Sequence, residues 1–521
     1  MLRILGSPKK LCHGFTRRDL LRIGGLGLAG LALPDILRLQ AAAADDGARR
    51  PASFGKAKSL ILLHLYGSPS QLEWADPKPE APVEVRGELG TIPSSLPSCG
   101  VCELLPHFAQ VMDRTTVLRS MTHPYPIHGV AYALTGVPQI DVAMELRPHD
   151  AGHWPFFGSV VQYVESGKAE SGERAGSVSD GPQSGNGRIG SGVARRAIPP
   201  NLALPFPFSS RRKGEVPRAG PYAAFLGRQY DPVWTDFEGE ATKAHKKTLQ
   251  DMVYDDNDPY IGVSDDCRFR LSASAVLPDD VTLDRLDRRR SLVEQFNLMR
   301  PSLASAAATA NLSKQQETAL ALLTSNALGE ALDVRREPEE TRELYGHTLF
   351  GQACLAARRA CEAGGRVVTV FWDEFGLAGS GWDTHWDHYP RMKNELCPGF
   401  DKAWYGLITD LDRRGLLDDV LVVCTSEHGR TPKLNSAAGG GRDHWSSVYT
   451  SLMAGAGVKR GHIVGASDKH GAEVADRPIS PKDLLATAYH LLGIDHASIV
   501  HDRLGRPLPL VDGHVIDEAL V

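Results

Sequence analysis

The sequence has no excess of positive charge and no long apolar segment. Its 58 lysines and arginines are outnumbered by 63 acidic residues, which gives a formal net charge of −5. No basic stripe with interleaved aromatic residues is present, so nucleic-acid binding is not expected. The weakly apolar segment 23–33 is interrupted by Pro34 and Asp35, well short of the ~20 residues that a membrane span requires. No internal repeat is found.

Cysteine is also scarce, with 8 in 521 residues. Cys99 and Cys102 form a single Cys-x-x-Cys pair with no second pair at zinc-finger spacing. A disulfide or plain buried thiols are therefore favoured over a metal knuckle or a redox motif. Only Cys12 precedes residue 44, so an odd number remains after it, and at least one thiol is expected to be unpaired or to pair between chains.

The N-terminal segment combines paired arginines with a short apolar stretch. Arg17 and Arg18 precede residues 23–33, and four alanines follow at 41–44. This order is typical of a twin-arginine signal peptide; an amphipathic first helix or a membrane anchor is the alternative. We predict a signal peptide at 1–44, a polar linker at 45–57, export by the twin-arginine route to the periplasm or beyond, and no stable membrane span after cleavage.

From residue 58 onward the pattern alternates between strands and helices. Apolar runs at 59–66, 367–372 and 420–424 are typical of buried parallel strands. Residues 400–411 carry apolar side chains at helical spacing. We therefore predict an α/β domain over 58–521, with a mostly parallel central sheet and helices on both faces.

Two stretches depart from this pattern. Residues 165–195 are rich in glycine, serine and charged residues, which predicts a flexible loop. The segment from about 196 to 363 begins with irregular, proline-containing sequence and continues with helical sequence. We predict that it is a helical and irregular insertion, forming a lid or surface excursion.

Three polar clusters lie beside predicted strands or glycine-rich loops, at 382–385, 426–430 and 441–445. Glu427 and His428 lie just past the carboxyl end of an apolar strand, where open α/β sheets place their ligands. The glycines at 439–441 would allow the third cluster to fold back toward them. We therefore expect the three clusters to share one site.

The side chains of these clusters are suited to binding metal. Asp383 and His385 are two residues apart and share one face of an extended segment. Together with Glu427, His428 and His444 they supply the imidazoles and carboxylates for one or two divalent ions, with zinc or manganese favoured. The alternative is that they are hydrogen-bonded polar groups at strand ends, with His385 and His388 on the surface.

Two arginines flank the same clusters. Arg430 and Arg442 have the planar, two-pronged donors that bind anionic groups. The alternative, equally favoured, is a salt bridge from either arginine to Glu427 or Asp443.

Several motifs resemble a known family, the domain of unknown function 1501 family of exported bacterial proteins, which are distant members of the alkaline phosphatase and sulfatase superfamily. The resemblance covers nearly all of the chain after the signal peptide. It rests on residues 67–73, 76–79, 382–385, 415–419, 427–432, 441–445 and 476–481.

The resemblance implies an alkaline-phosphatase-like fold with a metal centre. Asp383 and His385 resemble the ligands of one metal, Glu427 and His428 those of the other, and His444 the last metal histidine. No carboxylate directly follows the first strand, where the superfamily has its first metal ligand. Two later carboxylates are the candidates to replace it, Glu73 and Asp76.

The resemblance also implies hydrolysis of phosphate or sulfate esters, including sulfated glycans. The position of the superfamily's nucleophile is Pro126, which has no hydroxyl or thiol. Hydroxide activated by a metal is then expected to attack directly, with His128 or His123 as acid or base. The alternative is a non-catalytic relative that binds anionic glycans or an exported partner protein.

Overall fold

The computed structural model describes residues 51–521 apart from 126–127, 129, 139–146, 151, 172–197, 209–210, 213–217, 249, 272–325 and 377–380. Residues Ser53–Val521 form one compact unit. The predicted signal peptide lies outside the described residues, so its cleavage and the export route stay predictions. Across the described part of the chain, no helix combines the length and apolar character needed to cross a membrane.

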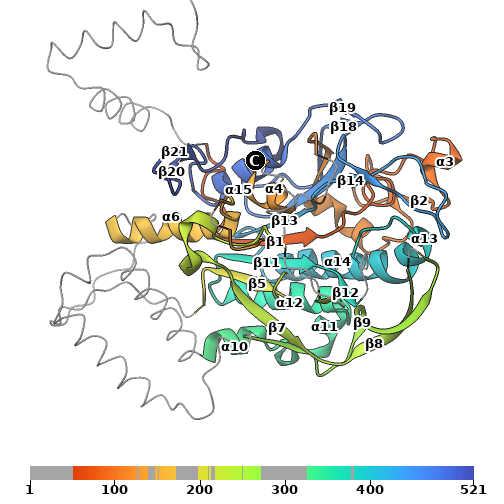
Figure 1. Ribbon diagram of the computed structural model, residues 1–521, viewed down its shortest axis with the longest axis horizontal. Coiled ribbons are helices and arrows are strands. Elements are labelled where there is room, and N and C mark those ends of the chain that lie inside the picture. Colours follow the sequence, from red (N-terminus) through yellow and green to blue (C-terminus); the bar gives the residue numbers. More distant parts are fainter. Residues whose placement is uncertain are drawn as a thin grey trace, which may run out of the picture. The chain divides into compact units, whose positions relative to one another are not determined.

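A nine-stranded sheet forms the centre of this unit (Figure 1). Five consecutive strands are all parallel, from β7 through β5, β11 and β1 to β13, whereas β16 runs antiparallel to both of its neighbours. The predicted mostly parallel sheet is confirmed. In spatial order the strands are β10 (Arg268–Leu271), β7 (Val233–Glu238), β5 (Asn201–Leu204), β11 (Val367–Trp372), β1 (Ser59–Leu65), β13 (Val420–Thr425), β16 (Tyr449–Ala454), β4 (Thr115–Met121) and β17 (His462–Val464).

Helices cover both faces of the sheet, because successive side chains of each buried strand point to opposite sides. Ile61 and Leu63 of β1 belong to one core with helices α12 (Leu349–Glu362) and α14 (Cys397–Arg413). Leu60 and Leu62 belong to a second core on the other face, with helices α4 (Val130–Thr135), α6 (Phe157–Ser171) and α15 (Pro481–Leu491) (Figure 1). This arrangement also agrees with the prediction.

The remaining described elements are shorter or lie outside the main sheet. In chain order they are α3 (Val83–Arg86), β2 (Thr91–Ile92), β3 (Val101–Cys102), η2 (Phe108–Arg114), β6 (Arg211–Arg212), η3 (Ala224–Leu226), η4 (Arg228–Tyr230), β8 (Ala241–Lys247), β9 (Val253–Val263), α10 (Asn326–Leu332), η6 (Val334–Arg336), α11 (Glu339–Tyr345), β12 (Phe375–Gly376), α13 (His388–Arg391), η7 (Met392–Leu396), β14 (Gly429–Arg430), β15 (His444–Trp445), β18 (Ala466–Ser467), β19 (Val474–Asp476), β20 (Ile499–His501), β21 (Pro507–Pro509) and η8 (Asp517–Ala519).

The segment 196–363 is not simply an insertion. It supplies β5, β7 and β10 to the main sheet and α12 to the core, while β8 and β9 form a separate hairpin. Strand β5 has only four residues and is followed directly by Pro205, so its sequence carries little strand signal. Its parallel pairing with β11 is a long-range contact that the local sequence does not reveal.

The predicted flexible loop at 165–195 begins inside a helix. Helix α6 continues to Ser171, and residues 172–197 lie outside the described part. The seven cysteines after residue 44 are all free and buried, so plain buried thiols are the alternative that the structure supports.

The sequence from Ser480 to Asp483 predicts a helix start, with an N-cap serine, proline at the first helical position and an acidic third residue. Helix α15 begins there. The Ser480 hydroxyl accepts a hydrogen bond from the Asp483 amide at 3.3 Å, and the Asp483 carboxylate accepts one from the Ser480 amide at 2.8 Å. We expect Ser480→Ala to lower the free energy of unfolding by about 1 kcal/mol, measured by urea denaturation. Ser480→Thr preserves the cap and is the control, and equal stability of the alanine variant and the wild type would contradict the expectation.

Candidate metal centre

The polar clusters meet at one edge of the sheet because of strand direction. β1, β11 and β13 are parallel and end at the same edge. β16 is antiparallel to both β13 and β4, so β4 also ends at this edge and β16 begins there. Residues that follow β1, β4, β11 and β13, or precede β16, are therefore brought together. Ligand sites of α/β sheets lie at this edge.

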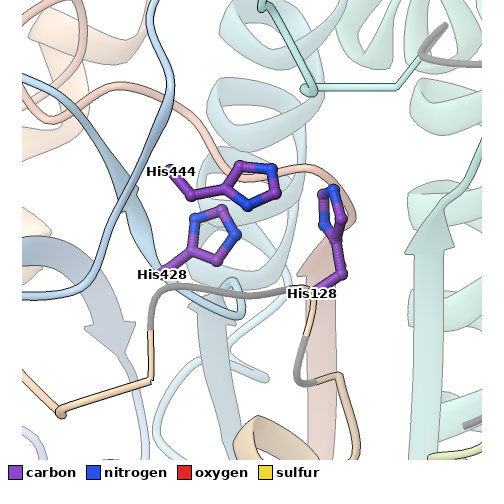
Figure 2. Close-up of side chains that lie close together, drawn as sticks. All are labelled: His128, His428 and His444. Atoms are coloured by element: carbon purple, nitrogen blue, oxygen red, sulfur yellow. The ribbon is translucent and has the colours of Figure 1, made fainter. Parts of the chain in front are cut away.

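Three histidines form the centre of the site (Figure 2). His128, His428 and His444 each offer a ring nitrogen within 4.8 Å of the others. The ring centroid of His444 lies 4.2 Å from that of His128 and 4.4 Å from that of His428. His428 and His444 meet because β14 and β15 pair antiparallel, with Arg430 opposite His444.

His428 presents a free lone pair to this cluster. Its Nδ1 lies 2.8 Å from the Gly429 carbonyl oxygen, which can only accept, so Nδ1 carries the proton. Its Nε2 is buried and has no hydrogen-bond partner. Burial lowers the pKa of His428 well below its ordinary value, which keeps the ring neutral and able to bind a cation.

A second group of three shares His444. Asp383 Oδ1 lies 3.1 Å from His385 Nε2 and 3.3 Å from His444 Nε2, and it accepts a hydrogen bond from Arg430 Nη2 at 2.6 Å. Burial alone would raise the pKa of Asp383, but Arg430 and the surrounding histidines hold it well below its usual range. Asp383 is therefore a fixed negative charge beside the histidine cluster.

Glu427 orients His128 and belongs to neither group of three. Its Oε1 accepts a hydrogen bond from the Gly67 amide at 2.7 Å and lies 3.0 Å from His128 Nδ1. A carboxylate that is hydrogen-bonded to an imidazole fixes the orientation of the ring. Burial alone would lower the pKa of His128, but its hydrogen bonds to Asp383 and Glu427 raise it to about 9. The negative charges of these two carboxylates therefore favour a positive charge at His128.

Gly67 allows this approach. Its φ of +90° favours glycine, and a Cβ there would lie 2.3 Å from the Asp383 amide nitrogen. The end of β1 can therefore come close to both Asp383 and Glu427.

His64 is a residue of the site that sequence reasoning missed. Its fully buried ring lies in β1, where its Nε2 is 3.5 Å from Glu427 Oε2 and its Nδ1 has no hydrogen-bond partner. The only signal in the sequence is a single histidine within the apolar run 59–65. His64 therefore contacts Glu427, which in turn orients His128.

We expect His64→Phe to weaken zinc binding about tenfold, the lower end of the effect of removing an outer partner of a ligand. The ring packs edge-on against Phe208 and Phe371, so phenylalanine should retain the packing and lose only the polar contact. Competition with a chelating dye measures the affinity. His490→Phe, at a buried histidine on α15, is the matched control, and equal affinities in both variants would contradict this role.

A family model described as a protein of unknown function (DUF1501) matches residues 57–520. The chain belongs to the DUF1501 family. No curated protein matches it.

Two solved structures illustrate what this DUF1501 protein is similar to. The PsFucS1 sulfatase from Pseudoalteromonas sp. is 10% identical, with a TM-score of 0.34, over 88% of this chain and 70% of that one. The phosphonate monoester hydrolase SpPMH from Silicibacter pomeroyi is 12% identical, with a TM-score of 0.32, over 89% and 76%.

The two arginines of the DUF1501 protein do not face an open anion site. Arg430 and Arg442 are fully buried, and the carboxylates that they bind are Asp383 and Glu73. The expected salt bridges are thus present with other partners. Asp443 pairs instead with His385, at 2.7 Å.

Neither of the substitute carboxylates joins the two groups of three. Glu73 accepts hydrogen bonds from Arg442 at 2.5 and 3.1 Å and faces the buried ring of His388. Asp76 lies 2.9 Å from Lys78 Nζ and 3.4 Å from Arg119 Nε. Both charges are already balanced by cations. His388 is completely buried, so the surface position that the alternative interpretation gave it is wrong.

His123 supports the loop after β13. Its Nε2 lies 2.7 Å from the backbone oxygen of Glu427, and burial lowers its pKa. Because the ring of His123 is buried and both of its nitrogens contact the backbone, a substrate cannot reach it, and His123 is poorly placed as an acid or base. Pro126, the position expected for a nucleophile, lies outside the described residues.

Proposed function

We propose that this DUF1501 protein is a metal-dependent hydrolase of phosphate or sulfate esters, with an ion held by His128, His428 and His444. The observation that carries the proposal is the cluster of three imidazoles in which His428 Nε2 is buried and unpartnered. Three imidazoles are a ligand set of catalytic zinc, which keeps a further position open for water or substrate.

The surrounding charges favour a cation at this place. Asp383 Oδ2 lies 3.4 Å from His128 Nε2, and Glu427 lies behind the same ring. In the metal-free protein a protonated His128 balances these carboxylates. When bound, a divalent ion would supply Lewis-acid stabilisation of the negative charge that develops on the ester.

His385 is the best candidate for the acid that protonates the leaving group. Its side chain is 29% exposed, so substrate can approach it, unlike the buried ring of His123. Its Nδ1 lies 2.7 Å from Asp443 Oδ1, and its Nε2 lies 3.1 Å from Asp383 Oδ1 and 3.0 Å from His444 Nε2. The hydrogen bond to Asp383 raises the pKa of His385, which holds a proton on the ring. This role replaces those expected for His123 and His128.

The substrate that fits this chemistry presents a phosphate or sulfate group, and an anionic glycan ester is one such class. The test uses the zinc-loaded and manganese-loaded protein with 4-nitrophenyl phosphate and 4-nitrophenyl sulfate. We expect hydrolysis of at least one ester that chelation abolishes and metal restores, and that His428→Gln lacks. A protein that binds metal but hydrolyses neither ester would instead favour the non-catalytic binding protein.

A further inference from the structure

We propose that the centre holds one divalent ion, and that the buried guanidinium of Arg430 takes the place of a second cation beside Asp383. This inference rests on the proposed function, because it presumes an ion at the histidine cluster. It adds the number of ions and a role for Arg430.

The two groups of three cannot both be complete ligand sets at the same time, because they share His444. A neutral imidazole has one protonated nitrogen and one lone pair, so His444 can serve one ion at a time. The unpartnered His428 Nε2 belongs to the histidine group. The ion is therefore expected among His128, His428 and His444.

The other group already has a cation. Arg430 is fully buried and donates to Asp383 Oδ1 at 2.6 Å and to the backbone oxygens of Ser68 and Arg442 at 3.2 and 3.1 Å. It also donates to the backbone oxygen of Gly67. Four oxygens from three separate segments thus converge on one positive charge.

This is the kind of oxygen set that hard divalent cations bind, a carboxylate with backbone carbonyls. The guanidinium provides the charge in a form that is always protonated. Unlike a bound metal ion, the guanidinium cannot dissociate from the protein. It fixes Asp383 beside His128, His385 and His444. Arg430 is therefore a positioning residue, acting through Asp383.

Metal stoichiometry gives the first test. The full-length protein is saturated with zinc, freed of unbound ions and analysed by elemental mass spectrometry and calorimetric titration. One equivalent is expected. Two equivalents that survive chelation of surface-bound zinc would overturn this inference and leave the proposed function intact, whereas none would overturn both.

Replacing the guanidinium gives the second test. Arg430→Met removes the charge at similar length and leaves the four oxygens without a cation. We expect millimolar calcium to raise the melting temperature of Arg430→Met by several degrees. The wild type and Arg442→Met, at an equally buried arginine that pairs with Glu73, should not respond.

A folded Arg430→Met variant that ignores calcium, or an equal response in Arg442→Met, would overturn the role of Arg430 as a substitute cation. If Arg430→Met does not fold, the zinc stoichiometries of the wild type and of Arg430→Lys decide whether the inference holds. Arg430→Lys retains a positive charge and is expected to bind one equivalent; two would overturn the inference.

Discussion

Replacing His428 by glutamine is expected to weaken zinc binding by at least about 100-fold. Losing even an outer partner of a ligand costs 10- to 100-fold, and His428 is placed to bind the ion itself through Nε2. Glutamine is of similar size and polar, so the change removes the imidazole lone pair with little loss of packing. Activity toward the ester substrate should fall in parallel, because the ion would be missing at working concentrations.

The measurement is equilibrium competition with a chelating dye, together with the metal content of the purified protein. His490→Gln is the matched control, at a buried histidine that contacts Ser53 rather than the site, and it should bind zinc like the wild type. Circular dichroism verifies that both variants are folded. Wild-type affinity in a folded His428→Gln protein would exclude the histidine cluster as the metal centre.

The buried pair of Glu73 and Arg442 is expected to produce the largest effect on stability. The two side chains are essentially inaccessible to solvent, and Glu73→Gln leaves the guanidinium without its counter-charge. Removing one partner of a buried ion pair costs about 3–5 kcal/mol. We therefore expect Glu73→Gln to lower the free energy of unfolding by roughly this amount at pH 7, measured by urea denaturation.

The effect should depend on pH in a defined direction. Burial alone would raise the pKa of Glu73, but Arg442 and His388 lower it from 4.5 to about 2. A carboxyl group with a lowered folded-state pKa stabilises the fold above its unfolded pKa, and this contribution is lost as pH falls toward the folded value. A shift of this size corresponds to about 3 kcal/mol. The difference between wild type and Glu73→Gln should thus shrink between pH 4.5 and about pH 2.

Asp418→Asn is the control for this series. Asp418 pairs with Arg460 on the surface, where its side chain is 84% exposed, and such pairs contribute at most about 1 kcal/mol. A difference for Glu73→Gln that stays constant down to pH 2, or that is no larger than that of Asp418→Asn, would contradict the assigned role of the pair.

Much of the candidate site could be predicted from the sequence because its main strands can be recognised locally and the alternation of strands and helices indicates a parallel sheet. The apolar runs of β1, β11 and β13 could be recognised, and parallel strands end at a common edge. Polar residues after those strands must then approach one another. Asp383 and His428 were expected together for this reason, and His444 because the glycines at 439–441 allow its segment to fold back. The structure places all three in the two overlapping groups.

The charge partners depended on tertiary structure. Glu73 and Arg442 are 369 residues apart and Asp383 and Arg430 are 47 apart, so no local pattern shows which carboxylate meets which arginine. His64 was missed because a single histidine in a buried strand looks the same in sequence whether it packs or supports a site.

The sequence by itself therefore determined the α/β class, the main buried strands, the start of α15 and the set of polar residues at the sheet edge. The strands and the helix start follow from side-chain periodicity and helix caps, which are properties of short segments, and the common edge follows because parallel strands end together. The tertiary structure decided that β5, β7 and β10 join the sheet, that Glu427 supports His128, and that Arg430 lies against Asp383. These outcomes require segments distant in the chain to pack together. Only the folded core brings the charged side chains of these segments within hydrogen-bonding distance.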